Sequence, residues 1–157
     1  MKSATHLESK TLVNRRLSHD FFIEKRFEAG IALCGTEIKS LRCGNGVILE
    51  SFIRLDRFGR PVWVNAHIGD YKFGNVHNHE STRSRYLLLH KREINELRGA
   101  LERKGEAVLP VKLYFKSGLA KLEIAICKPK KLFDKRRDLK EKAEQREAAR
   151  AFSKKYL

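Results

Sequence analysis

Apolar residues in the middle of the chain mostly recur at every second position, the spacing of β-strands that bury one face. Two such stretches double back on themselves. Residues 47–68 have turn residues at 56–61, and residues 108–126 have turn residues at 116–118. Both patterns predict β-hairpins, because segments with apolar alternation flank residues that favour turns.

The pattern differs outside these hairpins. Residues 21–34 form an apolar and aromatic run that predicts further strand, with a turn or bulge at Ala29–Gly30. From residue 91 to 104 apolar residues recur at helical spacing, and Gly105 follows as a helix stop. Five or six short strands and one helix favour a mainly β fold, a small closed barrel, since closure removes the exposed edges of a short sheet.

Charge divides the chain into two parts. The 157 residues include 34 Lys and Arg against 19 Asp and Glu, a net charge of +15. Residues 1–127 carry a net charge of +8, and residues 128–157 carry +7. The stretch Lys128-Pro129-Lys130-Lys131 marks the change, and its Pro has no N–H to donate to a strand ladder.

We therefore expect a loose, flexible arm over 1–13, one domain over 14–130 and a basic tail over 131–157. The tail is rich in good helix formers but has no apolar stripe wide enough to pack on the domain. It is expected to be disordered when free and helical on an anionic surface that neutralises it. A solvated tail that only aids solubility is the alternative.

Several classes of protein are disfavoured. No apolar run approaches the ~20 residues that cross a bilayer, and the start of the chain has no apolar signal-peptide core. Cys34, Cys43 and Cys127 are odd in number and widely spaced, which favours a reducing, cytoplasmic location. Cys34 and Cys127 lie in apolar segments, where buried structural thiols are expected.

The histidines invite a metal-site or hydrolase hypothesis. His67, His77 and His79 lie near Asp70 and Glu80, but no third ligand has diagnostic spacing and no His-Glu-x-x-His or Cys-x-x-Cys motif occurs. Motifs for an activated serine or for phosphate cradling are missing too. We therefore expect no catalytic residues, no metal and no cofactor.

Basic clusters beside apolar residues favour a nucleic-acid partner. They occur at 14–16, at 82–86 before an apolar run, and at 128–137 around Phe133. Arg and Lys neutralise phosphates, and neighbouring aromatic residues can stack on unpaired bases.

Blocks of the sequence, in order from about residue 13 to 140, resemble a known family. They are Asn-Arg-Arg at 14–16, Phe-Ile-Glu at 22–24, Phe-Glu-Ala-Gly-Ile-Ala-Leu at 27–33, Gly-Thr-Glu-Ile-Lys-Ser-Leu-Arg at 35–42, Thr-Arg-Ser-Arg-Tyr-Leu-Leu-Leu at 82–89, Glu-Ile at 93–94, and Lys-Pro-Lys-Lys-Leu-Phe-Asp-Lys-Arg at 128–136. They resemble SmpB, the SsrA-binding protein family. The resemblance implies an oligonucleotide-binding-type β-barrel with flanking helices and a basic C-terminal tail.

The resemblance also implies a function and partners. Such proteins bind the tRNA-like domain of transfer-messenger RNA (tmRNA, SsrA RNA) and deliver it to stalled bacterial ribosomes for trans-translation, ribosome rescue and tagging of the nascent peptide. Elongation factor Tu with GTP joins through aminoacylated tmRNA. The tail enters the vacant mRNA channel of small-subunit ribosomal RNA. A cytoplasmic monomer that makes no membrane contact is expected.

Candidate RNA-binding residues come from the family blocks and the basic clusters. They are Asn14, Arg15, Arg16, Glu28, Lys39, Arg42, Arg83, Arg85, Leu88, Lys121, Lys128, Lys130 and Lys131. Tail residues expected at the decoding centre and mRNA channel are Phe133, Asp134, Lys135, Arg136, Arg137, Lys140, Lys142, Arg146 and Arg150.

Two of these residues have open alternatives. Glu28 would accept hydrogen bonds from base or ribose donors or hold an Arg in place, with a structural ion pair as the alternative. Leu88 would offer a platform to a base, with core packing as the alternative. Glu37, in the Gly-Thr-Glu-Ile block, is expected to be structural.

Other classes of function remain. A general RNA-binding or ribosomal protein with the same kind of barrel predicts little preference for tmRNA. A hydrolase built on His77, His79, Asp70 and Glu80 predicts bound metal and turnover. A peripheral membrane protein is disfavoured, since the tail lacks a wide apolar face.

Overall fold

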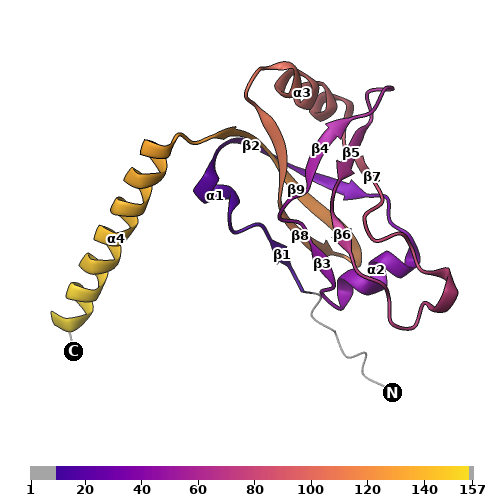
Figure 1. Ribbon diagram of the computed structural model, residues 1–157, viewed down its shortest axis with the longest axis horizontal. Coiled ribbons are helices and arrows are strands. Elements are labelled where there is room, and N and C mark those ends of the chain that lie inside the picture. The colour runs from indigo at the N-terminus through magenta and orange to yellow at the C-terminus, as the bar shows by residue number, and fades with distance from the viewer. Residues whose placement is uncertain (1–9, 156–157) are drawn as a thin grey trace.

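The structure is a computed structural model and describes residues 10–155. Strands form most of its body, and helices flank them (Figure 1). The elements are β1 (Leu12–Val13), α1 (Leu17–Asp20), β2 (Phe21–Ile31), α2 (Gly35–Arg42), β3 (Gly46–Val47), β4 (Phe52–Leu55), β5 (Pro61–Val64), β6 (His67–Ile68), the 3-10 turn η1 (Asn75–His77), β7 (Arg85–Leu88), α3 (Lys91–Glu102), β8 (Ala107–Lys116), β9 (Leu119–Pro129) and α4 (Leu132–Lys155).

The main sheet curls into a barrel like that of oligonucleotide-binding proteins. Its strands follow the order β1-β8-β4-β5-β7-β2-β9, and β9 pairs with β8 again. The pairing is longest from β2 through β9 to β8. The pairing is shortest between β4 and β8, which are joined by the single residue pair Ile53↔Val108. The mainly β fold predicted from the alternation is therefore confirmed.

One apolar core fills the barrel. Trp63, Leu113, Leu122 and Ile124 are fully buried there, and α3 contributes Leu97. A smaller cluster around Leu17, Ala125 and Cys127 lies on the opposite side of the sheet, beneath α1. The two clusters exist because β9 is covered on both faces near its end, so apolar residues there no longer alternate with polar ones.

Both predicted hairpins are present, as β4–β5 and β8–β9, and the predicted helix is α3. The turn predicted at Ala29–Gly30 is wrong. Strand β2 continues through both residues and is irregular earlier, between Ile23 and Lys25. Ala29 is fully buried in the core, and the residues around it continue strand β2 without turning.

The N-terminal end of the described chain differs from the expectation. Residues 1–9 of the predicted arm and residues 156–157 of the predicted tail lie outside the described part. Leu12 and Val13, predicted as the end of the arm, form β1 and pair with Leu113 and Lys112 of β8. The tail is a single helix, α4, which projects away from the barrel (Figure 1). Within residues 10–155 no helix has both the length and the apolar character to span a bilayer.

Candidate nucleic-acid interface

The outer face of β2, β9 and β8 carries a concentration of charged side chains. Phe27 and Ala29 of β2 point into the core, so Glu28 between them points outward. The register sets Glu28 opposite Glu123 of β9, and Glu123 opposite Lys112 of β8. We name this surface the Glu28 face, with members Arg26, Glu28, Leu88, Lys112, Tyr114, Lys116, Lys121 and Glu123.

Glu28 is held in a defined position at the centre of this face. The Tyr114 hydroxyl donates a hydrogen bond to its Oε2, and Lys116 Nζ lies 3.8 Å from its Oε1. The Tyr114 hydrogen bond, together with the charges of Lys116 and Lys121, lowers the pKa of Glu28 from its usual 4.5. Partial burial and then the Glu28 carboxylate raise the pKa of Tyr114 to about 12. At neutral pH the pair is therefore a neutral phenol beside a charged carboxylate that can accept further hydrogen bonds.

A shallow hollow of about 360 Å³ adjoins Glu28. It brings Glu28, Leu88 and Lys121 together from three different strands. Leu88 is 63% exposed, and Gly30 lies beneath it, where an added Cβ would come within 3.2 Å of Leu88 Cβ. A carboxylate acceptor, an apolar surface and an ammonium group thus meet at one point, which suits a base and its phosphate.

The remaining charges of the Glu28 face are partly paired. Arg26 Nη1 lies 3.0 Å and Lys112 Nζ 3.1 Å from the carboxylate of Glu123. Arg26, Lys112, Tyr114 and Lys116 were not among the predicted site residues. Alternation along β8 could have indicated Lys112 and Tyr114, because Leu113 between them is buried and they must therefore face outward.

Arg83 and Arg85, both predicted to bind RNA, are held by Glu37 of α2. Glu37 and Arg85 are fully buried, and Arg85 Nε donates to Glu37 Oε1 at 2.8 Å. Arg83 Nη2 donates to Glu37 Oε2 at 2.5 Å. Burial alone would raise the pKa of Glu37, but hydrogen bonds from Arg83, the Cys34 N–H and Arg85 hold it below 4.5.

The prediction of Arg85 as a direct RNA contact is corrected by this geometry, because a fully buried guanidinium cannot reach a phosphate. Its remaining hydrogen bonds go to backbone carbonyls, among them Ala66 O at 2.9 Å. Arg83 is less enclosed, with 29% of its side chain exposed. The structural role expected for Glu37 matches its burial, whereas Cys34, expected to be buried, is exposed.

Asn14, Arg15 and Arg16 lie beyond the β1 edge of the Glu28 face. Asn14 is buried, with only 8% of its surface exposed. It lies beside the part of β8 between Val108, which pairs with β4, and Lys112, which pairs with β1. Its N–H donates to Val111 O at 2.8 Å and its Nδ2 to Pro110 O at 3.1 Å. Arg15 and Arg16 are both exposed.

Lys39 and Arg42, the two cations of α2 predicted to bind RNA, are exposed but have local contacts. Lys39 Nζ lies 5.5 Å from the centre of the Tyr71 ring. Arg42 Nη2 donates to Gly118 O at 3.3 Å, at the β8–β9 turn.

The root of the tail is fastened to α1. Lys135 Nζ lies 2.8 Å from Asp20 Oδ1, and Lys130 donates to both Ser18 O and the Asp138 carboxylate. The hydrogen bond from Lys135 and that from His19 lower the pKa of Asp20. Predicted RNA contacts by Lys130 and Lys135 would therefore have to compete with these internal partners.

Lys128 is also paired, since its Nζ lies 3.2 Å from Glu106 Oε1 and 3.8 Å from Glu24 Oε2. The other predicted residues of this region are more available. The backbone N–H of Lys131 donates to Asp134 Oδ2 at 3.2 Å. Phe133 is 65% exposed, and Arg136 and Arg137 are exposed. Arg137 forms an ion pair with Glu141 one turn along α4.

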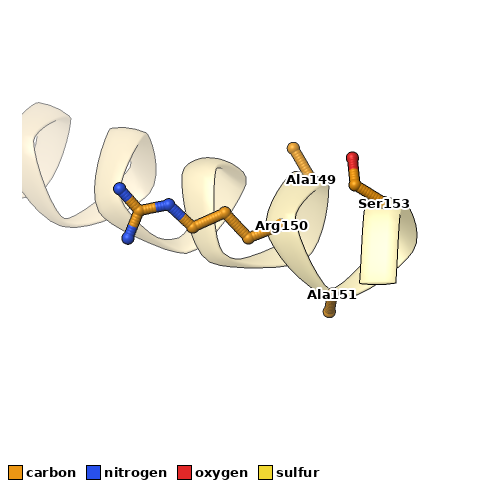
Figure 2. Close-up of a pocket in the computed structure, with 4 residues that line it drawn as sticks. All are labelled: Ala149, Arg150, Ala151 and Ser153. Atoms are coloured by element: carbon orange, nitrogen blue, oxygen red, sulfur yellow. The ribbon is translucent and has the colours of Figure 1, made fainter. Parts of the chain in front are cut away.

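Beyond its root, α4 makes a solvent-exposed rod. Every side chain from Leu139 to Ser153 is exposed, including the predicted tail residues Lys140, Lys142, Arg146 and Arg150. Figure 2 shows the hollow near its end, where Ala149, Arg150, Ala151 and Ser153 all come from the one helix. A single helix gives only one wall, so nothing there encloses a small molecule.

The histidine cluster is dispersed by the fold. Both ring nitrogens of His79 lie 3.0 Å from an oxygen, one from Thr36 Oγ1 and the other from Ile68 O. His79 thereby ties α2 to β6. Among residues 10–155, no three His, Cys, Asp or Glu side chains are grouped closely enough to hold a metal ion.

Comparisons with known proteins agree with one another. The model of the SmpB protein family matches residues 11–154. An SsrA-binding protein of Geobacter sulfurreducens is 51% identical over 142 residues, which cover 90% of this chain and 92% of that protein. One from Oceanobacillus iheyensis is 50% identical over 138 residues, covering 88% and 89%. A solved chain described as "tmRNA-SmpB: a journey to the center of the bacterial ribosome" aligns with a TM-score of 0.65 and 42% identity, covering 78% of this chain and 85% of that chain.

Proposed function

This chain belongs to the SmpB family, and from that membership we propose that it binds tmRNA and acts in trans-translation on stalled ribosomes. One observation carries the assignment of the RNA site: Glu28, Leu88 and Lys121, which come from three different strands, converge on one hollow. In this proposal Lys121 neutralises a phosphate, Leu88 packs against a base, and Glu28 accepts hydrogen bonds from a base or ribose.

The finer roles follow from the same proposal. The barrel recognises the tRNA-like domain, and tmRNA carrying an amino acid brings elongation factor Tu with GTP. The protein acts as a cytoplasmic monomer without catalysis of its own. The tail, α4, enters the vacant mRNA channel, whose ribosomal RNA attracts its cations.

Specificity is tested by a gel-shift comparison of tmRNA with bulk tRNA at two salt concentrations. Binding through phosphates alone weakens steeply for both RNAs as salt rises, whereas base and shape contacts keep the preference for tmRNA. A protein that binds both RNAs equally at both salt concentrations would instead be a general RNA-binding protein.

The hollow on the Glu28 face is tested by Leu88→Asp and Lys121→Gln. Leu88→Asp places a carboxylate against phosphates and should weaken tmRNA binding at least about tenfold. Lys121→Gln should lower the slope of log affinity against log salt by roughly one, as expected for one lost phosphate contact.

Two variants elsewhere serve as matched controls for this measurement. Val76→Asp changes an apolar residue that is 94% exposed in the 3-10 turn η1, and Lys104→Gln changes an exposed lysine after α3. Both should bind tmRNA like the unaltered protein. If all four variants bind alike, the Glu28 face is not the tmRNA site.

The tail is proposed to be mostly unfolded in the free protein, although the structure describes it as helix α4. Its side chains from Leu139 to Ser153 are all exposed, and helices held by no tertiary packing are marginal in water. Amide hydrogens of residues 140–155 should exchange with less than about tenfold protection, against strong protection in β9. Protection of these residues equal to that of α3 would contradict the proposal.

A further inference from the structure

Aromatic and arginine side chains gather around the turn between β4 and β5. Phe58 in this turn is 66% exposed, and Tyr86 of β7 is 43% exposed. The guanidinium carbon of Arg57 lies 4.6 Å from the centre of the Phe58 ring. That of Arg60 is shared by the two rings, 5.2 Å from the centre of Phe58 and 4.5 Å from the centre of Tyr86. We name Arg57, Phe58, Arg60, Tyr86 and Arg98 of α3 together the Phe58 patch.

Positive charge dominates the Phe58 patch. Asp56 is the one acidic residue of the turn at 56–61, and its Oδ2 accepts a hydrogen bond from Arg60 Nε at 2.8 Å. Arg57 and Arg98 are exposed and form no ion pair within residues 10–155. A Cβ added to Gly59 would lie 2.7 Å from Arg98 Nη2, so this guanidinium lies directly against the turn. Two unpaired arginines therefore remain for an anionic partner.

The turn has a fixed shape before any partner binds. Asp56 Oδ1 accepts hydrogen bonds from the backbone N–H groups of Phe58 and Arg60, both at 2.9 Å. Gly59 has a φ of 76°, which glycine adopts without steric cost. Arg60 Nη2 donates to the Tyr86 hydroxyl at 2.9 Å, which joins the turn to β7. A partner therefore meets a preformed surface, and little conformational entropy is lost in ordering it.

The Phe58 patch adjoins the Glu28 face. Tyr86 and Leu88 both point outward from β7, since the strand residues that alternate with them are buried. Along the strand these two residues are roughly 7 Å apart. Leu88 lines the hollow of the Glu28 face. An extended chain bound in that hollow can therefore continue over Tyr86 and Arg60 to Phe58.

We propose that the Phe58 patch binds an unpaired nucleotide of the same tmRNA that contacts the Glu28 face, an inference that rests on the proposed function. The base stacks on the exposed ring of Phe58, and Arg57 and Arg98 neutralise the phosphates on either side of it. Exposed aromatic rings flanked by cations hold single strands in this way, because every base offers a flat face.

An acidic peptide is the other anionic partner, and the patch suits it less well. Carboxylates would pair with Arg57 and Arg98 but would leave the Phe58 ring uncovered. The ring has no hydrogen-bonding group, so it gains from binding only when a flat or apolar group packs on it. A nucleotide supplies both the anionic charge and the flat group.

The aromatic contact is tested by gel shifts of tmRNA with variants of the full chain. Phe58→Ala should weaken tmRNA binding about tenfold through the lost base stack, whereas Phe58→Tyr should bind like the unaltered chain. The matched control is Phe73→Ala, because Phe73 is 74% exposed and also lies beside another aromatic ring, that of Tyr71. This control should leave tmRNA affinity unchanged, and melting temperatures check that each variant folds.

The cationic contacts are tested by the salt dependence of tmRNA binding. Arg57→Gln/Arg98→Gln should lower the slope of log affinity against log salt by about 1.4, the value for two phosphate contacts of a single strand. Lys72→Gln/Lys104→Gln removes two exposed lysines elsewhere and should keep the slope.

A photochemical cross-link tests the contact without relying on affinity. Phe58 replaced with p-benzoylphenylalanine should cross-link to tmRNA under illumination, at an unpaired nucleotide located by primer extension. The same replacement of Phe73 should give no cross-link. A cross-link from position 58 to paired nucleotides alone would overturn the proposal.

The outcomes separate this inference from the proposed function. If Leu88→Asp weakens tmRNA binding while Phe58→Ala and Arg57→Gln/Arg98→Gln do not, the Phe58 patch is overturned and the Glu28 face stands. If the unaltered chain does not prefer tmRNA to bulk tRNA, both are overturned. If Phe58→Ala keeps tmRNA affinity but loses binding of a labelled glutamate decamer, the patch serves an acidic protein segment, which also overturns the proposal.

Discussion

Replacing Glu37 with Gln is expected to destabilise the protein by about 3–5 kcal/mol, the cost of removing one partner from a buried ion pair. Arg85 is fully buried and its Nε is bonded to Glu37 Oε1 at 2.8 Å, so the variant leaves a buried guanidinium without a counter-charge. Arg83 loses its charged partner as well. Because small domains are stable by only ~5–15 kcal/mol, this loss is a large fraction of the total.

Urea unfolding measures the effect, and its pH dependence tests the cause. The folded pKa of Glu37 lies below its ordinary value of 4.5, so its contribution is complete above about pH 4.5 and is lost as pH falls through the folded pKa. The difference in free energy of unfolding between the unaltered protein and Glu37→Gln should therefore be largest near neutral pH and shrink below pH 4.5.

The control is Glu96→Gln, which removes the partner of Lys25 at the surface. Both side chains of that pair are about half exposed, so the expected change is below ~1 kcal/mol. Equal destabilisation by Glu37→Gln and Glu96→Gln would show that the Glu37 cluster contributes no more than an ordinary surface pair.

The same cluster explains one limit of prediction from the sequence. The run Thr82-Arg83-Ser84-Arg85 looks like a surface, and the partner that buries it, Glu37, is 46 to 48 residues away. The local sequence pattern contains no information on which residue pairs with Arg85. Alternation could only have indicated that Arg85 is buried, because it shares a strand face with Leu87, which is 4% exposed.

The two hairpins were predictable for a simple physical reason. Apolar alternation in the β8–β9 hairpin reflects one buried face, and the turn has positive φ angles at Ser117 and Gly118, of which glycine adopts such an angle without steric cost. Helix α2 escaped prediction because it is only eight residues long and is capped by Cys34, an uncommon N-cap residue.

For the site, the family resemblance indicated Glu28, Leu88 and Lys121, which the fold brings to one hollow. It did not indicate that Tyr114 and Lys116 would hold Glu28, because those contacts cross from β2 to β8. It also did not distinguish exposed Arg15 from buried Asn14 beside it. That difference arises because Asn14 is hydrogen-bonded to Val111 O and Pro110 O of β8, whereas Arg15 faces solvent.

A chain that ends at Arg137 is expected to bind tmRNA with an affinity within about threefold of the full chain but to support no tagging of stalled peptides. Residues 138–157 carry six Lys and Arg against four Asp and Glu, so their loss removes only a net charge of +2 from an RNA-binding surface that the barrel retains. The α4 side chains from Leu139 to Ser153 are all exposed, so the barrel does not bury them. Tagging, in contrast, is proposed to require this segment in the vacant mRNA channel.

Translation of a message without a stop codon, supplied with tmRNA, measures tagging, and a gel shift measures tmRNA affinity. Ala149→Pro is the informative companion, because it keeps every charge of the tail but costs about 3 kcal/mol in a helix interior. It should keep tmRNA affinity and reduce tagging, whereas Ala149→Ser should keep both. Equal loss of tmRNA affinity and tagging in the shortened chain would contradict a division of roles between barrel and tail. Full tagging by Ala149→Pro would show that the tail acts through its charge, without needing to form the helix that the structure describes.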